Sequence, residues 1–127
     1  MRLIAELKPF IAAPILLGLL ASACSRSKVD QYPGIPEQVA QGAVIIDTRT
    51  PEEFSSGHID GAVNIPYDRI LESIETHVPH KSDPVIVYCR SGKRSGMAKN
   101  TLDKSGYAQV LDAGSMKRLN ELLTADP

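Results

Sequence analysis

The sequence is poor in cysteine, lacks tryptophan and carries almost no net charge. Its two cysteines, Cys24 and Cys89, are too few for a domain held together by a dense set of disulfides. The 14 Lys and Arg residues nearly balance the 15 Asp and Glu residues, so nothing indicates a nucleic-acid partner. Internal repeats and low-complexity tracts are absent. The 127 residues have room for one globular domain.

Residues 1–23 have the pattern of a bacterial secretory signal. Arg2 and Lys8 accompany an apolar stretch over residues 9–20, which is too short to span a bilayer core comfortably. Small residues at 21–23 then precede Cys24 directly. We therefore predict a signal peptide over 1–23, a polar tether over 24–34 and a folded domain over 35–127, with export to the periplasm.

Two modes of signal cleavage fit the residues before Cys24. Ala21-Ser22-Ala23 satisfies the small-x-small rule for ordinary cleavage. Residues 20–24 also resemble a lipobox, in which Cys24 is lipidated and becomes the first mature residue, although Ala21 stands where leucine is usual. We expect lipidation at Cys24, and Ser25 after it favours the outer membrane. The lipid would then be the only membrane contact.

The remaining sequence alternates short apolar runs with amphipathic segments. Continuous apolar runs with β-branched residues predict buried strands over 43–46, 62–65, 85–88 and 108–111. Helices are expected over 35–41, 67–77, 93–105 and 115–123, and from Pro51 to a stop at Gly57. Thr50, followed three positions later by Glu53, forms a capping box for the helix at Pro51. This order predicts an α/β domain whose parallel sheet is covered by helices on both faces.

Cys89 follows the apolar run 85–88 and begins the loop Cys89-Arg90-Ser91-Gly92-Lys93-Arg94-Ser95. Sites in α/β proteins form beyond the carboxyl ends of the strands. A loop of this kind can direct successive backbone N–H groups at the sulfur, with Gly92 taking a positive φ and the next helix adding its positive end. Such a cysteine is expected to have a lowered pKa and to react as a thiolate. The competing interpretation, a buried structural thiol, does not account for the basic loop.

The charge of this loop indicates the kind of substrate. Arg90, Lys93 and Arg94 place three cations in a chain whose net charge is −1, which points to a small anion. No cluster of His, Cys and Asp residues has the spacing of metal ligands, so we expect no metal and no cofactor.

Two segments, VIIDTRTPEEFSSGHIDGAVNIP and PVIVYCRSGKRSGMAKNTLDKSGY, resemble the rhodanese superfamily over about residues 35–120. The resemblance implies a three-layer α/β domain with a five-stranded parallel sheet. It also implies thiosulfate sulfurtransferase chemistry, in which Cys89 takes the outer sulfur of thiosulfate as a persulfide, releases sulfite and passes the sulfur to cyanide or a thiol. Residues 90–95 match the substrate-binding loop of the family. We expect a monomer.

Other matches to the family concern support of the site. Asp47 and Arg49 match an Asp-x-Arg sequence that braces the loop and the neighbouring helix, together with Glu53. His58 matches a Gly-His-Ile-x-Gly-Ala turn, where the resemblance implies that it orders the backbone.

Two residues depart from the family near the C-terminus. Ser115 stands in place of a glycine and Leu119 in place of a tryptophan, and the chain has no tryptophan at all. These departures concern the wall of the pocket, not the cysteine loop.

Three other functions compete with the sulfurtransferase. Phosphatases and arsenate reductases of this fold use Cys-x5-Arg, but the sixth residue after Cys89 is Ser95, and the arginine stands one position earlier at Arg94. A periplasmic persulfide carrier fed by a protein partner would use the same Cys89 and differ only in its sulfur donor. An inactive interaction module usually lacks the cysteine.

Overall fold

A computed structural model of the protein describes residues 34–125. The expected signal peptide, Cys24 and the expected tether up to residue 33 lie outside the described residues. Within residues 34–125, no helix is both long enough and apolar enough to cross a membrane.

Strands and helices alternate along the chain, as the apolar runs predicted. The strands are β1 (Val44–Asp47), β2 (Val63–Asn64), β3 (Val85–Cys89) and β4 (Val110–Ser115). The helices are α1 (Ile35–Ala40), α2 (Pro51–Ser55), α3 (Ile70–His77), α4 (Lys93–Lys104) and α5 (Met116–Thr124), with the 3-10 turn η2 (Tyr67–Arg69) before α3.

The strands form one parallel sheet in the order β2-β1-β3-β4. Strands β1 and β3 are neighbours, and Asp47 at the carboxyl end of β1 is the register partner of Tyr88 in β3. Tyr88 is the residue directly before Cys89. The expectation of five strands was wrong for the part of the chain that the structure describes, where the sheet has four. The residues directly before β1 form α1, with a proline in its first turn, and cannot add a strand.

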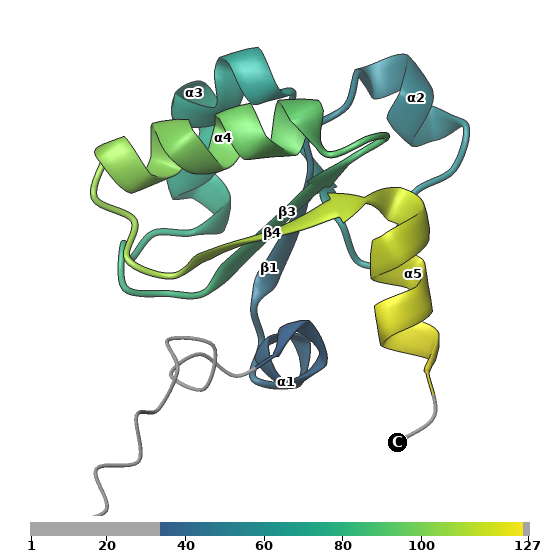
Figure 1. The fold of residues 1–127 in the computed structure, drawn as a ribbon. Coiled ribbons are helices and arrows are strands. Elements are labelled where there is room, and N and C mark those ends of the chain that lie inside the picture. Colours follow the sequence, from purple (N-terminus) through teal and green to yellow (C-terminus); the bar gives the residue numbers. More distant parts are fainter. Residues whose placement is uncertain (1–33, 126–127) are drawn as a thin grey trace, which may run out of the picture.

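Helices cover both faces of the sheet, which gives the expected three layers. Helices α3 and α4 lie on one face, while α1 and α5 lie on the other (Figure 1). Side chains alternate along β3, so that Val85 and Val87 face α3 and α4, while Ile86 and Tyr88 face α1 and α5. This two-sided burial explains why β3 is apolar at every position before the cysteine.

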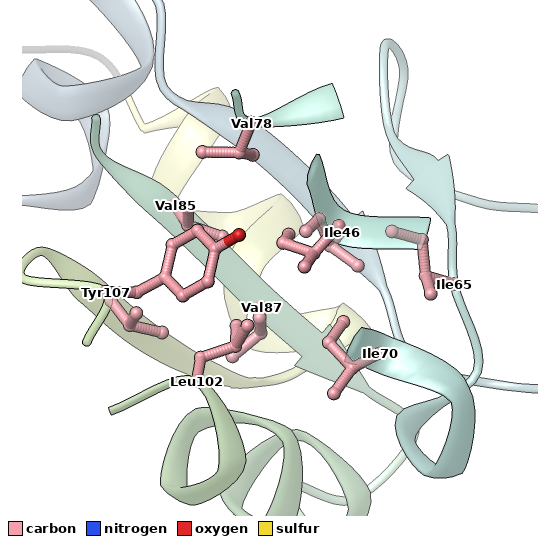
Figure 2. Packing of buried hydrophobic residues seen from close by; sticks show 10 residues of the cluster. Ile46, Ile65, Ile70, Val78, Val85, Val87, Leu102 and Tyr107 are labelled. Carbon is pink, nitrogen blue, oxygen red and sulfur yellow. The ribbon is translucent and has the colours of Figure 1, made fainter. Parts of the chain in front are cut away.

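The core under α3 and α4 is almost entirely aliphatic. Figure 2 shows Ile46, Val85 and Val87 from the sheet packed against Ile70 and Leu102 of these two helices, with Tyr107 beside them. Burial of such side chains stabilises the fold by about 1.5–3 kcal/mol for each fully buried residue. The sheet is therefore a firm support for the polar loops at its carboxyl edge.

The largest differences from the expected boundaries are in β4 and at the start of α3. Strand β4 begins at Val110 and continues to Ser115, because a bulge opposite Val87 and Tyr88 lets its pairing with β3 continue past the polar Asp112. The helix expected from Tyr67 begins as the 3-10 turn η2 and becomes α-helical at Ile70.

Candidate active site

Cys89 is the last residue of β3 and lies at the carboxyl edge of the sheet, where such sites were expected. The chain turns through residues 90–92, and α4 begins at Lys93. The cysteine is 0% exposed. Burial by itself would also fit a structural thiol, so the polar groups around the sulfur decide between the two interpretations.

Hydrogen-bonding groups of the loop surround the Cys89 sulfur. The backbone N–H of Gly92 donates to Sγ at 2.9 Å. The Cys89 thiol donates to the Ser95 hydroxyl oxygen at 3.5 Å, and that hydroxyl donates to the carbonyl oxygen of Gly92 at 3.1 Å. When the thiol loses its proton, rotation of the Ser95 hydroxyl turns its proton to the sulfur instead. A structural thiol has no need of N–H donors aimed at its sulfur, whereas a thiolate is stabilised by them.

These contacts outweigh the effect of burial on the thiol. Burial alone raises the pKa of Cys89, but hydrogen bonds from the Ser95 side chain and from the backbone N–H groups of Ser95, Gly92 and Ser91 lower it, and the net pKa shift is downward. The expected lowered pKa is confirmed in direction. The thiolate, which is the nucleophilic form, is therefore favoured.

Two glycines allow the loop to approach the end of β4. Gly92 has a φ of +96°, the left-handed conformation expected for it, and a Cβ atom there would lie 3.4 Å from the Cα of Gly114. Gly114 also has a positive φ, 77°, and its N–H donates to Oδ1 of Asp112 at 2.8 Å. Side chains at either position would strain the backbone beside the sulfur.

The three loop cations have different surroundings. Arg94 forms a two-point ion pair with Glu53 of α2, in which Nη1 lies 2.6 Å from Oε1 and Nη2 lies 3.0 Å from Oε2. Arg90 and Lys93 are exposed, and within residues 34–125 neither takes part in an ion pair.

Asp47 and Arg49 belong to a buried network that also includes Tyr88. Arg49 donates to both carboxylate oxygens of Asp47 and, at 2.6 Å, to the carbonyl oxygen of Gly57. The Tyr88 hydroxyl donates to Asp47 at 2.8 Å and accepts the N–H of Ile59 at 3.0 Å. Burial is the main cause that raises the pKa of Tyr88 to about 12, so the hydroxyl remains a donor. The contacts are those of a brace between β1, β3 and the turn at 57–59.

His58 contributes to the same turn from its outer side. The exposed imidazole stacks on the Phe54 ring at a centroid distance of 3.7 Å, and Nδ1 lies 2.8 Å from the Phe54 carbonyl oxygen. This placement fits the expected role in ordering the backbone.

The two residues that depart from the family have separate structural tasks. Ser115 is the N-cap of α5, where its hydroxyl accepts the N–H of Arg118 at 3.1 Å. Leu119 is 0% exposed and packs in the core under α1 and α5. Leu119 therefore fills the core beneath the site.

Sequence reasoning did not identify the roles of Tyr88, Ser95 and Gly114. Tyr88 offered one signal, because a tyrosine in an otherwise apolar buried strand needs a partner for its hydroxyl. Glu53 was expected to brace the loop together with Asp47 and Arg49, and its carboxylate binds Arg94 of that loop, a partner that the sequence did not specify. The partner of a charged side chain depends on tertiary distances that the sequence does not contain.

Comparisons with known proteins agree with this geometry. The family model described as a rhodanese-like domain matches residues 35–119. The chain is 47% identical over 72 residues to thiosulfate sulfurtransferase PspE of Escherichia coli, covering 57% of this chain and 69% of PspE. It is 41% identical to thiosulfate sulfurtransferase 16 of Arabidopsis thaliana chloroplasts, covering 53% of this chain and 64% of that relative.

Solved structures show the same fold. A rhodanese from E. coli, solved with anions, has a TM-score of 0.58 at 45% identity, with 60% of this chain and 89% of that chain covered. The human single-domain sulfurtransferase TSTD1 has a TM-score of 0.58 at 26% identity, with 67% of this chain and 88% of that chain covered. The parallel α/β sheet with Cys89 at its carboxyl edge, together with these relatives, defines the class as rhodanese-type sulfurtransferases. The chain belongs to the rhodanese-like domain family.

Proposed function

We propose that the protein moves sulfane sulfur from thiosulfate to a thiol or to cyanide through a persulfide on Cys89. The observation that carries the proposal is the Cys89 sulfur held by the Gly92 N–H and by Ser95, with a lowered pKa. The similarity to two proteins named thiosulfate sulfurtransferase supports thiosulfate as the donor.

The reaction has two balanced steps. The Cys89 thiolate attacks the outer sulfur of thiosulfate, a new S–S bond forms, the original S–S bond breaks and sulfite leaves with the electron pair. Cyanide or a thiolate then attacks the outer persulfide sulfur, and Cys89 leaves as a thiolate. The N–H donors that stabilise the resting thiolate also stabilise it as the leaving group of the second step.

The loop charges support an anionic donor. Arg90 and Lys93 are exposed cations on either side of Gly92, whose N–H contacts the sulfur. The similar E. coli rhodanese was solved with anions, which is consistent with an anionic donor for this chain. Attraction by the two cations would raise the local concentration of a dianion such as thiosulfate.

Access to the sulfur requires a local movement. Because Cys89 has no exposed surface, a donor reaches Sγ only when the residues that cover it shift. Gly92, whose N–H contacts the sulfur, belongs to the loop that would have to move.

The direct test is to mix the purified protein with thiosulfate and cyanide and to measure thiocyanate. Formation of thiocyanate by the wild-type protein and its loss in Cys89→Ser would support the proposal. If the wild type is inactive with thiosulfate but accepts sulfur from a protein persulfide, the carrier function is correct instead.

We also propose export to the periplasm and attachment to the outer membrane through a lipid on Cys24. The support is the order of basic, apolar and small residues before Cys24. The lipid anchor would leave the folded domain in the aqueous periplasm.

A further inference from the structure

Glu53 and Arg94 connect two segments that leave neighbouring strands. Helix α2 follows β1, and α4 begins at the cysteine loop after β3. The ion pair joins Glu53 to Arg94 at 2.6 and 3.0 Å, with both side chains about one-quarter exposed, at 29% and 26%. Two parallel contacts of this kind fix the direction of the guanidinium as well as its position.

Arg94 also lies close enough to Cys89 for the two charges to interact. It stands between Gly92 and Ser95, which both contact Sγ. The negative charge of Cys89 contributes to raising the pKa of Arg94, after the larger effect of the Glu53 hydrogen bond. Release from Glu53 would therefore leave an unpaired cation in the loop that holds the sulfur.

The Glu53 carboxylate is fixed on its other side as well. Its Oε1 accepts from the Thr50 N–H at 3.4 Å, and the Thr50 hydroxyl accepts the Glu53 N–H at 3.2 Å, which completes the capping box. Hydrogen bonds from Arg94 are the main cause that lowers the pKa of Glu53 to about 2. The carboxylate thus stays charged at every pH at which the enzyme is expected to work.

We propose that Glu53 is a specificity-determining residue that withholds Arg94 from the substrate anion, so that Arg90 and Lys93 alone attract the donor. The proposal rests on the sulfurtransferase function proposed above and adds to it a limit on anion affinity. Neutralising one of three cations weakens the binding of the donor dianion. The same weakening favours departure of the product sulfite, which is also an anion.

The test compares the reaction of Cys89 with iodoacetate, an anion, and iodoacetamide, a neutral molecule of similar size. The ratio of the two rates cancels changes in thiolate content and in access to the buried sulfur. Glu53→Gln should raise this ratio by about threefold to tenfold, as expected for a charge at the partly exposed site. Glutamine preserves the capping box, so the variant should fold.

A matched control removes the same charge from the neighbouring residue. Glu52 is exposed in the same helix and, within residues 34–125, forms no ion pair. Glu52→Gln should change the ratio by less than about 1.5-fold, because solvent and salt screen an unpaired surface charge. An equal rise in the two variants would overturn the proposal, as would no rise in Glu53→Gln.

A second pair of variants separates withholding from direct binding. Arg94→Ala leaves an unpaired Glu53 carboxylate and should lower the ratio, while Glu53→Gln combined with Arg94→Ala should restore it nearly to the wild-type value. If the double variant stays as low as Arg94→Ala, Arg94 binds the anion in the wild type and the proposal is wrong.

The thiosulfate reaction gives an independent measurement. Glu53→Gln should lower KM for thiosulfate by about threefold or more while kcat changes less, since the contacts of Gly92 and Ser95 with Sγ are unaltered. If the protein has no activity with thiosulfate but the alkylation ratio behaves as described, the donor assignment fails and the role of Glu53 stands. A KM that rises in Glu53→Gln would show that the pair serves only to brace the loop.

Discussion

The Tyr88 hydroxyl donates a 2.8 Å hydrogen bond to Asp47, and these residues are register partners on neighbouring strands. The same hydroxyl accepts the N–H of Ile59 at 3.0 Å. One side chain therefore ties β1, β3 and the turn after α2 together, directly beside Cys89. The carboxylate of Asp47 is fully buried, and its partners are the Tyr88 hydroxyl and the Arg49 guanidinium.

Tyr88→Phe should lower the free energy of unfolding by about 1–3 kcal/mol, because it leaves the buried Ile59 N–H without its partner and removes one hydrogen bond to Asp47, which keeps those from Arg49. Thermal or denaturant unfolding measures the loss. Tyr107→Phe is the matched control, since Tyr107 is also buried but forms no hydrogen bond through its hydroxyl within residues 34–125. Equal losses in the two variants would contradict a bracing role for the Tyr88 hydroxyl.

Ser95→Ala should raise the pKa of Cys89, because it removes the side chain that contributes most to lowering that pKa. The ultraviolet absorbance of the thiolate against pH measures the change. Ser91→Ala is the control, since Ser91 acts through its backbone N–H, which alanine retains. A pKa that is unchanged in Ser95→Ala would assign the whole effect to the backbone.

The lowered pKa of Cys89 also has a consequence for stability. The folded state binds the thiol proton less tightly than the unfolded state, so the thiolate contributes stability above the unfolded pKa. This contribution is lost as the pH falls through the folded pKa. The free energy of unfolding should therefore change less with pH in Cys89→Ser than in the wild type over that range.

Intact-mass analysis after thiosulfate treatment should show one added sulfur on the wild-type protein. Cyanide should remove it, and Cys89→Ser should show none. The physical reason is that Cys89 is the only cysteine in the part of the chain that the structure describes, so no second thiol is present there to resolve the persulfide. Added sulfur on the variant would mean that another residue carries it.

Lys93→Ala should lower kcat/KM for thiosulfate, because its ammonium is expected to form a charge-assisted contact with the donor. The loss should correspond to about 1–3 kcal/mol of transition-state stabilisation. The rate of alkylation by iodoacetamide should change much less, because it reports mainly the thiolate. Lys104→Ala removes the same charge at the opposite end of α4 and is the control. Loss of activity in both variants to the same extent would argue against a local anion site.

Cys24→Ala should abolish fatty-acid labelling and release or misprocess the protein in cells that make the full chain. The wild type should be membrane-bound, labelled and begin at Cys24. A soluble, unlabelled wild type would instead favour ordinary cleavage after Ala23.

The sequence by itself determined the layers of the fold and the position of Cys89 at the carboxyl end of a buried strand. Runs such as Val85–Tyr88 are buried on both sheet faces, and a strand buried on both faces needs apolar residues at successive positions. The Thr50–Glu53 capping box and the positive φ of Gly92 were also predictable, because both depend on residues close together in the chain.

Tertiary structure alone decided the partners of polar side chains that lie far apart in the chain. Glu53 and Arg94 are 41 positions apart, as are Asp47 and Tyr88, and nothing in their local sequence specifies these pairs. Parallel pairing of β1 with β3 brings the segments after both strands to one edge of the sheet. Charge and hydrogen-bonding energies depend on distances of a few ångströms, which only the packed sheet and helices set.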